Sequence, residues 1–230
     1  MLYAVGALYV MGGAERSGNS SLAAEYNFHC DPEAAHLVLL KVYPRFANAV
    51  SIAAEGCSIW RKCLLHSLVN SMSANSSDCA DALAMNDSCV PQFPETILVT
   101  WECTIAHAVP WDYVKAWEAL TTPKGSFMTS VMANSLAYER GRTPMPAGWI
   151  ACDPLAVALA AEDGMETEDG TAPLLQESTM IHCAVELTGV LTRGQCVFDW
   201  NKVGSTKPNV RLVTKVDLEQ FAKLLHDSML

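Results

Sequence analysis

Apolar segments typical of buried strands alternate along this chain with clearly marked helix starts. Leu2–Val10 is rich in Leu, Val, Tyr and Ala, as expected for a strand that is buried in a parallel sheet. Asp31 and Pro32 then mark a helix start, with Asp at the N-cap and Pro at the first helical position. Asp153 and Pro154 repeat this pattern. The alternation predicts an α/β fold with a mainly parallel sheet.

The other predicted elements keep the same alternation. The last helix begins with a pattern similar to a capping box, in which Gln220 follows Asp217 by three residues. Two polar stretches, 12–27 and 162–177, are predicted as loops. Helices are predicted over 111–120, 126–138 and 216–225, and strands over 96–100, 181–187, 196–200 and 210–214.

Composition limits the kinds of protein that this chain can be. Its 230 residues, half of them apolar and 17% charged, suffice for one globular domain with a sizeable core. No apolar run reaches the ~18 residues that a membrane-spanning helix needs. The formal net charge of −10 argues against nucleic acid as a partner, because phosphate backbones are bound by basic surfaces. We therefore expect a globular protein that binds neither membranes nor nucleic acid.

Cysteine is frequent in this chain but follows no metal or disulfide pattern. The nine cysteines are an odd number, and their spacings match neither a zinc site nor a small disulfide-bonded scaffold. The apolar start, Met1–Met11, has no basic leader and is interpreted as a strand rather than a signal peptide. Reduced thiols and a cytoplasmic location are the resulting expectation.

Residues 44–95 differ in character from the rest of the chain. They contain four of the cysteines and many Ser and Asn residues, and only 59–72 is predicted as a helix. We interpret this Cys/Ser-rich segment as an atypical insertion that interrupts a single domain over 1–225. A lid, a partner-binding insertion and a gene-model artefact are the alternative interpretations.

The densest group of ligand-type side chains follows the first strand. That strand ends at Met11 in two glycines, and the loop beyond carries Asn19, Glu25 and Asn27. Open α/β sheets bind ligands beyond the carboxyl ends of their strands. Amide and carboxylate groups suit a ligand with many hydroxyls, because each hydroxyl both donates and accepts hydrogen bonds. The alternative is that Asn19 and Asn27 only stabilise turns.

Several motifs occur here in a characteristic order and spacing. MGG, GN, EYN and DPEAA lie between Met11 and Ala35, CDPLA covers Cys152–Ala156, and ELTG, LTRGQ and DW lie between Glu186 and Trp200. Together they resemble the ribose-binding signature, late aspartate motif and closing strands of the inosine-uridine preferring nucleoside hydrolases. The resemblance covers about 1–43 and 96–225. It implies a three-layer nucleoside-hydrolase-like α/β fold with a mainly parallel sheet.

The resemblance also implies an activity and a set of site residues. The activity is calcium-dependent hydrolysis of the N-glycosidic bond of ribonucleosides, which releases the base and ribose. By motif, Asn19, Glu25 and Asn27 would hold the ribose hydroxyls, and Met11 would line the sugar pocket. Asp153 would be a calcium ligand, which is consistent with the preference of calcium for oxygen ligands. Its alternative role is that of a simple N-cap.

This sequence departs from the family pattern beside the late aspartate. Cys152 stands where characterised members have a histidine that is proposed to protonate the departing base, so Cys152 is the candidate catalytic residue. A neutral thiol is a weak acid in this role, and the alternative is a small buried side chain. His107 and His29 are further candidates to approach the pocket, with structural roles as the alternative. A cysteine-based enzyme using Cys152 lacks an identified base partner.

A second departure concerns the family's opening strand, which ends in an aspartate-rich turn. That turn supplies the general base and most of the calcium ligands, and no counterpart is found in this sequence. The expectation is therefore an N-terminally truncated fold whose chain alone is inactive. Because a sheet edge would be exposed, we expect the isolated chain to aggregate or to be only marginally stable. The alternative to a hydrolase is an inactive homologue or a ribose-binding or interaction module. The expected partner is a ribonucleoside, and a homo-oligomer is left open.

Overall fold

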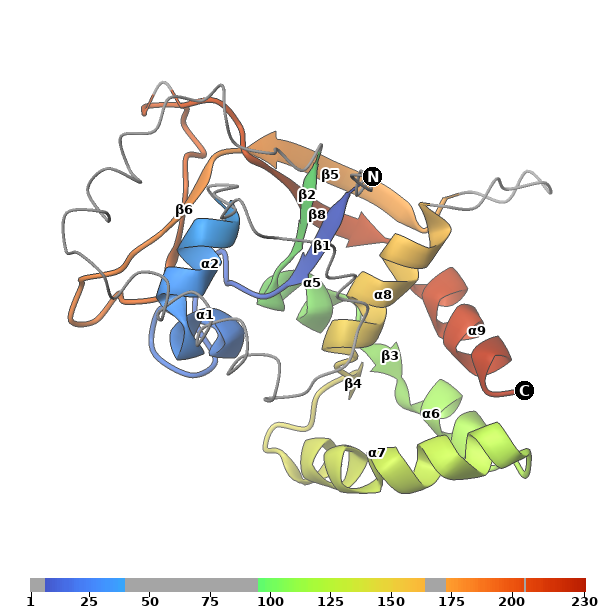
Figure 1. Cartoon of the computed structure of the whole chain (residues 1–230). Helices are drawn as coiled ribbons and strands as arrows, with labels where there is room; N and C mark the ends of the chain where they lie inside the picture. The colour runs from blue at the N-terminus through green and yellow to red at the C-terminus, as the bar shows by residue number, and fades with distance from the viewer. Residues whose placement is uncertain (1–6, 40–94, 164–172, 205) are drawn as a thin grey trace, which may run out of the picture. The chain divides into compact units, whose positions relative to one another are not determined.

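The computed structural model describes residues 7–39, 95–163, 173–204 and 206–230 (Figure 1). The chain divides into two compact units, and the described residues all belong to the one formed by Val5–Leu40 and Phe93–Leu230. The predicted insertion at 44–95 lies outside the described residues, apart from Glu95, and so does its predicted helix.

Four strands form the main sheet in the order β1 (Leu8–Met11), β2 (Thr96–Val99), β8 (Val210–Val216) and β5 (Leu175–Ile181). β1, β2 and β8 are parallel, whereas β5 runs antiparallel to β8. The predicted mainly parallel sheet is thus confirmed. The first predicted strand is confirmed from Leu8 onward, and its earlier residues lie outside the described ranges.

The segment around residue 182 corrects the sequence-based expectation. A single strand was predicted over 181–187, but Ile181 ends β5 and Cys183 begins β6 (Cys183–Val185). β6 pairs with β7 (Cys196–Phe198) in a separate antiparallel pair. β5 itself begins inside the predicted acidic loop, because four of its seven residues are polar and these give no apolar signal. These residues therefore form a strand because they pair with β8, and not because their side chains are buried.

The described helices are mostly those that the sequence predicts. Asp31 and Asp217 cap their helices as expected, accepting from the N–H groups of Ala34 (3.0 Å) and Gln220 (2.9 Å). α1 and α5 are short helices that the sequence did not predict. The helices are α1 (Tyr26–Cys30), α2 (Pro32–Leu39), α5 (Trp101–Ala106), α6 (Trp111–Glu118), α7 (Pro123–Gly141), α8 (Cys152–Glu162) and α9 (Leu218–Ser228).

The start of α8 differs from the predicted one. The helix begins at Cys152, its N-cap is Ala151, and no side chain caps it. The Leu155 N–H donates to the Ala151 carbonyl (3.2 Å), which places Asp153 inside the first turn. The N-cap interpretation of Asp153 is therefore wrong, although the same Asp-Pro pattern is a true cap at Asp31. Asp153 is exposed, and its charge favours the helix N-terminus.

Both faces of the sheet are covered, as a three-layer fold requires. Side chains of successive strand residues point to opposite faces. Ile97 and Val99 pack in one apolar cluster with residues of α8 and α9, whereas Leu98 packs in a second cluster with Phe28 of α1 and residues of α2, β6 and β7. Figure 1 shows α8 beside β1 and α2 beside β6.

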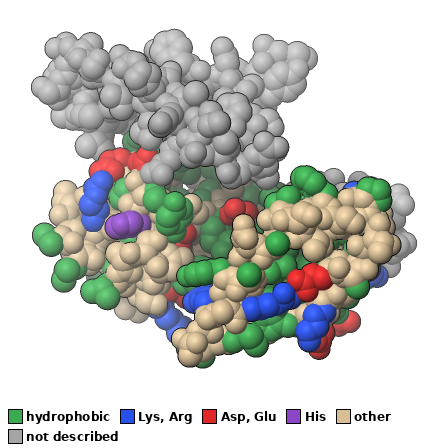
Figure 2. Space-filling model, turned by 90° about the horizontal axis from the view of Figure 1, so that it is seen from below, with side chains coloured by type: hydrophobic (Ala, Val, Ile, Leu, Met, Phe, Trp, Pro, Cys, Tyr) green, Lys and Arg blue, Asp and Glu red, His purple; other side chains and the backbone are tan. Residues whose placement is uncertain are grey.

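The surface carries charges of both signs. Figure 2 shows Lys and Arg side chains interspersed with Asp and Glu over the described part of one face. Most ion pairs there and elsewhere are exposed, including the bidentate pair between Arg140 and Glu118. Among the described helices, none is long and apolar enough to cross a membrane.

Candidate active site

β1 and β2 end next to each other in a glycine turn. Met11 lies opposite Val99 in the parallel register. The Gly12 N–H donates to the Val99 carbonyl (3.0 Å), and the Trp101 N–H donates to the Gly13 carbonyl (2.9 Å). Gly13 has a φ of +73°, a left-handed conformation that glycine adopts at low cost. This turn opens the glycine loop (residues 12–27) at the sheet edge where α/β folds bind ligands.

Glu25 is the most buried of the predicted site residues, with 2% of its surface exposed. It is the N-cap of α1, and its carboxylate accepts hydrogen bonds from the N–H groups of Asn27 (3.0 Å) and Phe28 (3.4 Å). The same carboxylate accepts from the Gly13 N–H (2.9 Å). Oε1 takes part in one of these bonds and Oε2 in three, so Oε1 can still accept from a ligand hydroxyl.

Electrostatics connects Glu25 to the start of α8. Burial raises the pKa of the Glu25 carboxyl above its ordinary value, and hydrogen bonds from Asn27, Gly13 and Phe28 oppose this rise. The negative charge of Asp153 raises the pKa of Glu25 further. The carboxyl groups of Glu25 in the glycine loop and Asp153 in α8 are therefore close enough for their charges to interact.

Asn27 and Met11, which the family resemblance assigns to the sugar-binding site, contact each other. The Asn27 Nδ2 donates to the Met11 carbonyl oxygen (3.3 Å) and to its Sδ (3.5 Å). Asn27 is exposed and Met11 is half-buried. Within the described residues the Asn27 Oδ1 accepts no hydrogen bond, so this oxygen can receive one from a ligand hydroxyl.

Asn19 has a structural role in the glycine loop. Its Oδ1 accepts from the Tyr26 N–H (2.8 Å) at the start of α1 and from the Ser20 hydroxyl (3.4 Å). The turn-stabilising interpretation of Asn19 is thus correct for Oδ1. The side chain is exposed, and its Nδ2 donates to no described residue, which leaves two donors for a ligand.

Cys152 lies at the start of α8 near both carboxylates. Its Sγ donates to the Thr104 hydroxyl (3.7 Å) and to the Ile150 carbonyl (3.8 Å). Burial raises the pKa of the Cys152 thiol to about 11, and the charges of Asp153 and Glu25 contribute to the rise. The structure therefore brings Cys152, Asp153 and Glu25 into one neighbourhood, with the thiol protonated at neutral pH.

The donors in this neighbourhood do not form a complete calcium site. Calcium takes about six to eight oxygen ligands, usually including several carboxylates. Among the described residues there is no group of three or more His, Cys, Asp or Glu side chains that could hold a metal ion. Asp153 is exposed and can offer a carboxylate, whereas the Glu25 carboxylate is largely engaged by backbone N–H groups.

Among the described residues, neither of the two histidines considered from the sequence forms a side-chain hydrogen bond to Glu25, Cys152 or Asp153. His107 is buried, its Nδ1 lies 2.8 Å from the Cys103 carbonyl, and its Nε2 accepts from the Val216 N–H (3.0 Å). Both ring nitrogens thus have backbone partners, one in α5 and one in β8, so the side chain joins these two elements. The structural interpretation of His107 is therefore confirmed. His29 is exposed in the last turn of α1.

Glu102 is a residue near the site that sequence reasoning missed. Its carboxylate accepts three backbone hydrogen bonds from the glycine loop, from Glu15 (2.8 Å), Arg16 (2.9 Å) and Ser17 (3.2 Å). Glu15 in turn accepts from the Thr100 hydroxyl (2.7 Å). These partners are more than 80 residues apart in sequence, so no local pattern signals them.

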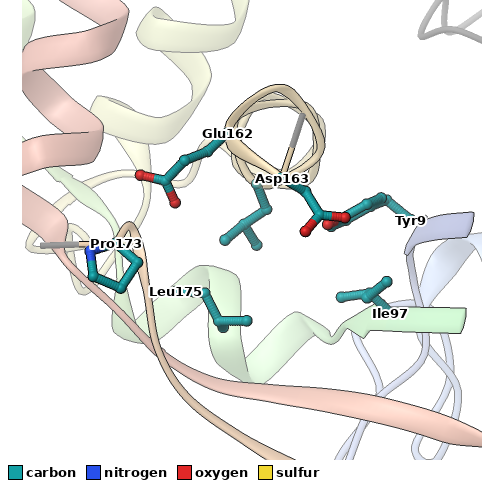
Figure 3. Close-up of a pocket in the computed structure, with 7 residues that line it drawn as sticks. Tyr9, Ile97, Glu162, Asp163, Pro173 and Leu175 are labelled. Atoms are coloured by element: carbon teal, nitrogen blue, oxygen red, sulfur yellow. The ribbon is translucent and has the colours of Figure 1, made fainter. Parts of the chain in front are cut away.

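A cavity of about 340 Å³ lies elsewhere, between the end of α8 and the sheet (Figure 3). Figure 3 shows the Asp163 carboxylate directed toward Tyr9, whose pKa is raised by burial and by its hydrogen bond to Asp163. None of the predicted site residues lines this cavity. Its lining residues are Tyr9, Ile97, Leu159, Glu162, Asp163, Pro173 and Leu175.

Comparison with solved structures shows the fold. The chain is similar to an inosine-guanosine nucleoside hydrolase, with a TM-score of 0.61, 22% identity, and coverage of 94% of this chain and 49% of that chain. It is also similar to a purine-preferring ribonucleoside hydrolase from Gardnerella vaginalis, with a TM-score of 0.61 and 18% identity. That match covers 97% of this chain and 52% of the Gardnerella chain. The predicted fold is thus found in nucleoside hydrolases, over about half of their length.

Sequence comparison shows the family. The chain is 22% identical over 222 residues to the pyrimidine-specific ribonucleoside hydrolase RihA of Escherichia coli. The aligned region covers 96% of this chain and 52% of RihA. The chain spans about half the length of the curated relatives that it matches. The family match extends over residues 2–223 and includes 44–95, so it gives no support for an insertion there. This chain belongs to the inosine-uridine preferring nucleoside hydrolase family.

Proposed function

We propose that this protein hydrolyses the N-glycosidic bond of ribonucleosides and that its glycine loop binds the ribose. Membership of the nucleoside hydrolase family supports the reaction class. The similar proteins named above include pyrimidine-specific, inosine-guanosine and purine-preferring enzymes, so the base is left undefined. The substrate class is therefore a ribonucleoside with a purine or pyrimidine base.

The arrangement around Glu25 carries this proposal. Its buried carboxylate joins the glycine turn to the start of α1, at the carboxyl ends of two parallel strands. Asn27 and Asn19 extend exposed amide groups from the same loop. Such a set of fixed donors and acceptors can bind several sugar hydroxyls at once and hold the sugar in a reactive geometry.

Cys152 is the proposed neighbour of the departing base. With a pKa of about 11 the thiol is protonated at neutral pH and can donate a hydrogen bond, but it is a weaker acid than a histidine. We infer that Cys152 contributes by contact and hydrogen bonding, and that another group activates the base. This role depends on the family position of Cys152.

The metal remains a proposal that rests on the family. Asp153 is the described residue that would offer calcium a carboxylate, and the exclusion of an N-cap role leaves this side chain available. When bound, calcium makes a coordinated water easier to deprotonate. The absence of the aspartate-rich turn from this sequence, the insertion at 44–95, a cytoplasmic location and a homo-oligomeric state likewise remain predictions.

An assay for free ribose tests the proposed reaction. The 230-residue chain is incubated with inosine or uridine plus calcium, and released ribose is quantified. Release that is lost in Glu25→Ala supports the proposal and contradicts the sequence-based expectation that this chain alone is inactive. Glu177→Ala, a change of an exposed carboxylate in β5, serves as the matched control.

The second candidate function is ribose binding without catalysis. It is favoured by one observation, the absence of a metal-binding group of carboxylates from the described residues. Calorimetry with D-ribose and with calcium separates the two candidates. Ribose binding without ribose release and without tight calcium binding supports the second candidate, whereas tight calcium binding contradicts it.

A further inference from the structure

Glu102 connects the α5 segment to the glycine loop through an unusual set of bonds. One carboxylate oxygen, Oε2, accepts from the Glu15 N–H (2.8 Å), and Oε1 accepts from the N–H groups of Arg16 (2.9 Å) and Ser17 (3.2 Å). Hydrogen bonds to an ionised acceptor are shorter and stronger than neutral ones. A single side chain therefore holds three successive residues of the loop.

These bonds lie between the two parts of the loop that carry the proposed site. On one side is the glycine turn, where the Trp101 N–H, next to Glu102, donates to the Gly13 carbonyl (2.9 Å). On the other side is Asn19, whose Oδ1 accepts from the Tyr26 N–H (2.8 Å). Without Glu102, nothing else among the described residues accepts from the N–H groups of Glu15, Arg16 and Ser17.

We propose that Glu102 is a positioning residue for ribose binding: its three backbone hydrogen bonds hold the glycine loop so that Asn19 and Glu25 face the sugar. This inference rests on the proposed function, because it concerns the same site. Glu102 acts through the loop backbone rather than by touching the sugar. Loops without such attachments lose binding energy to the ordering of the chain when a ligand binds.

Thr100, the N-cap of α5, provides a second attachment between the α5 segment and the glycine loop. The Thr100 hydroxyl donates to the Glu15 Oε1 (2.7 Å) and also accepts from the Cys103 N–H (3.4 Å) at the start of α5. Thr100 is fully buried. The loop is thus attached to a rigid helix start, which is the kind of support that keeps a binding site in its productive geometry.

Two variants of Glu102 distinguish positioning from general stabilisation. Glu102→Ala removes all three bonds. Glu102→Gln retains one acceptor oxygen, which can keep the two bonds from Arg16 and Ser17, and loses the bond from Glu15. Glu177→Ala is the matched control, because Glu177 is an exposed carboxylate paired with Lys215 on the sheet.

The experiment combines amide hydrogen exchange with D-ribose calorimetry on the full 230-residue chain. In Glu102→Ala we expect exchange of the 15–17 amides to rise about tenfold, while amides of β8 keep their rates. We also expect the ribose dissociation constant to rise about tenfold in Glu102→Ala, and to stay within about threefold of the unaltered chain in Glu102→Gln and Glu177→Ala.

The outcomes separate the two claims. Unchanged exchange at 15–17 in Glu102→Ala, an unchanged ribose constant, or exchange that rises equally throughout β8 overturns the positioning role of Glu102. Failure of the unaltered chain to bind ribose contradicts the proposed function itself, and the exchange data then still report whether Glu102 holds the loop.

Discussion

At the scale of single residues, burial determines what the site carboxylates can do. Glu25 is almost completely buried and its charge is compensated mainly by backbone N–H groups, whereas Asp153 is exposed in the first turn of α8. Two carboxylates of the same neighbourhood therefore have different roles. Glu25 organises the loop, and Asp153 presents its charge to solvent or to a ligand.

The raised pKa of Glu25 predicts a pH dependence of stability. The folded chain holds the Glu25 proton more tightly than the unfolded chain, so the contribution of Glu25 to the free energy of unfolding falls as the pH rises from 4.5 through the raised pKa. We expect Glu25→Gln to gain stability relative to the unaltered chain as the pH rises above about 4, as measured by denaturant unfolding over a series of pH values.

The control for this prediction is Glu177→Gln, which changes a carboxylate that is largely exposed. Its difference from the unaltered chain is expected to vary little over the same pH range, because surface ion pairs contribute little. A Glu25→Gln difference that stays constant with pH, or that decreases as the pH rises, contradicts the account.

Gly13 gives a second prediction at this scale. Its φ is +73°, and an added Cβ would lie 2.5 Å from the Cys196 Sγ. Gly13→Ala is expected to lower the free energy of unfolding by about 1–3 kcal/mol, because it adds both backbone strain and a steric clash. Adding Cys196→Ala removes the clash and is expected to restore part of the loss. Denaturant unfolding of the four chains measures this coupling.

Gly141 is the matched control, because nothing lies within 4 Å of a Cβ added there. Gly141→Ala should leave the stability unchanged or raise it slightly. Equal effects of Gly13→Ala and Gly141→Ala would show that the glycine turn is not sterically constrained.

For two residues, Asp153 and Glu102, the local sequence pattern did not predict the role seen in the structure. Asp31 and Asp153 share the same local pattern, yet only Asp31 caps a helix. The two helices differ because α2 starts at the proline of the pattern, whereas α8 starts two residues before its proline, at Cys152, closely after the two-residue strand β4 (Gly148–Trp149). Glu102 gave no signal at all, since its partners are backbone N–H groups that any sequence contains.

At the scale of secondary structure elements, contacts between segments decided what the local pattern left open. Five of the seven described helices overlap predicted ones: α2 and α6 begin at the predicted residue, and α7, α8 and α9 begin within three residues of it. α1 and α5, with five and six residues, are too short to show the 3.6-residue period of a helix. β5 is polar and exposed, so only its pairing with β8 defines it.

His107 provides a test of how two elements are joined. It bridges α5 and β8 through hydrogen bonds to the Cys103 carbonyl and from the Val216 N–H. His107→Ala is expected to lower the free energy of unfolding by at least about 1–3 kcal/mol, because it leaves a buried N–H group unpaired. Thermal or denaturant unfolding measures the loss.

His29→Ala is the comparison, since His29 is exposed and should tolerate the change within about 0.5 kcal/mol. If His107→Ala left the stability intact and instead abolished ribose release, His107 would be a catalytic residue and the structural assignment would be wrong.

At the scale of the whole molecule, the described unit contains an α/β sheet with the ribose-type loop at its edge. Within the described residues β1 pairs only with β2, so it is an edge strand of the sheet. The family, the mainly parallel sheet and the loop that carries the candidate site all followed from motifs in the sequence. A metal site did not follow from the sequence, and the described residues contain no group of three or more His, Cys, Asp or Glu side chains that could hold one.

D-ribose titration of the 230-residue chain measures whether the glycine loop binds ribose. We expect one ribose per chain and a dissociation constant that rises about tenfold or more in Asn27→Ala, because that variant loses the amide that we propose to contact the sugar. Ser130→Ala, an exposed change on α7, should leave the constant unaltered. No ribose binding by the unaltered chain, or equal affinity in Asn27→Ala, would contradict the claim that the glycine loop binds ribose.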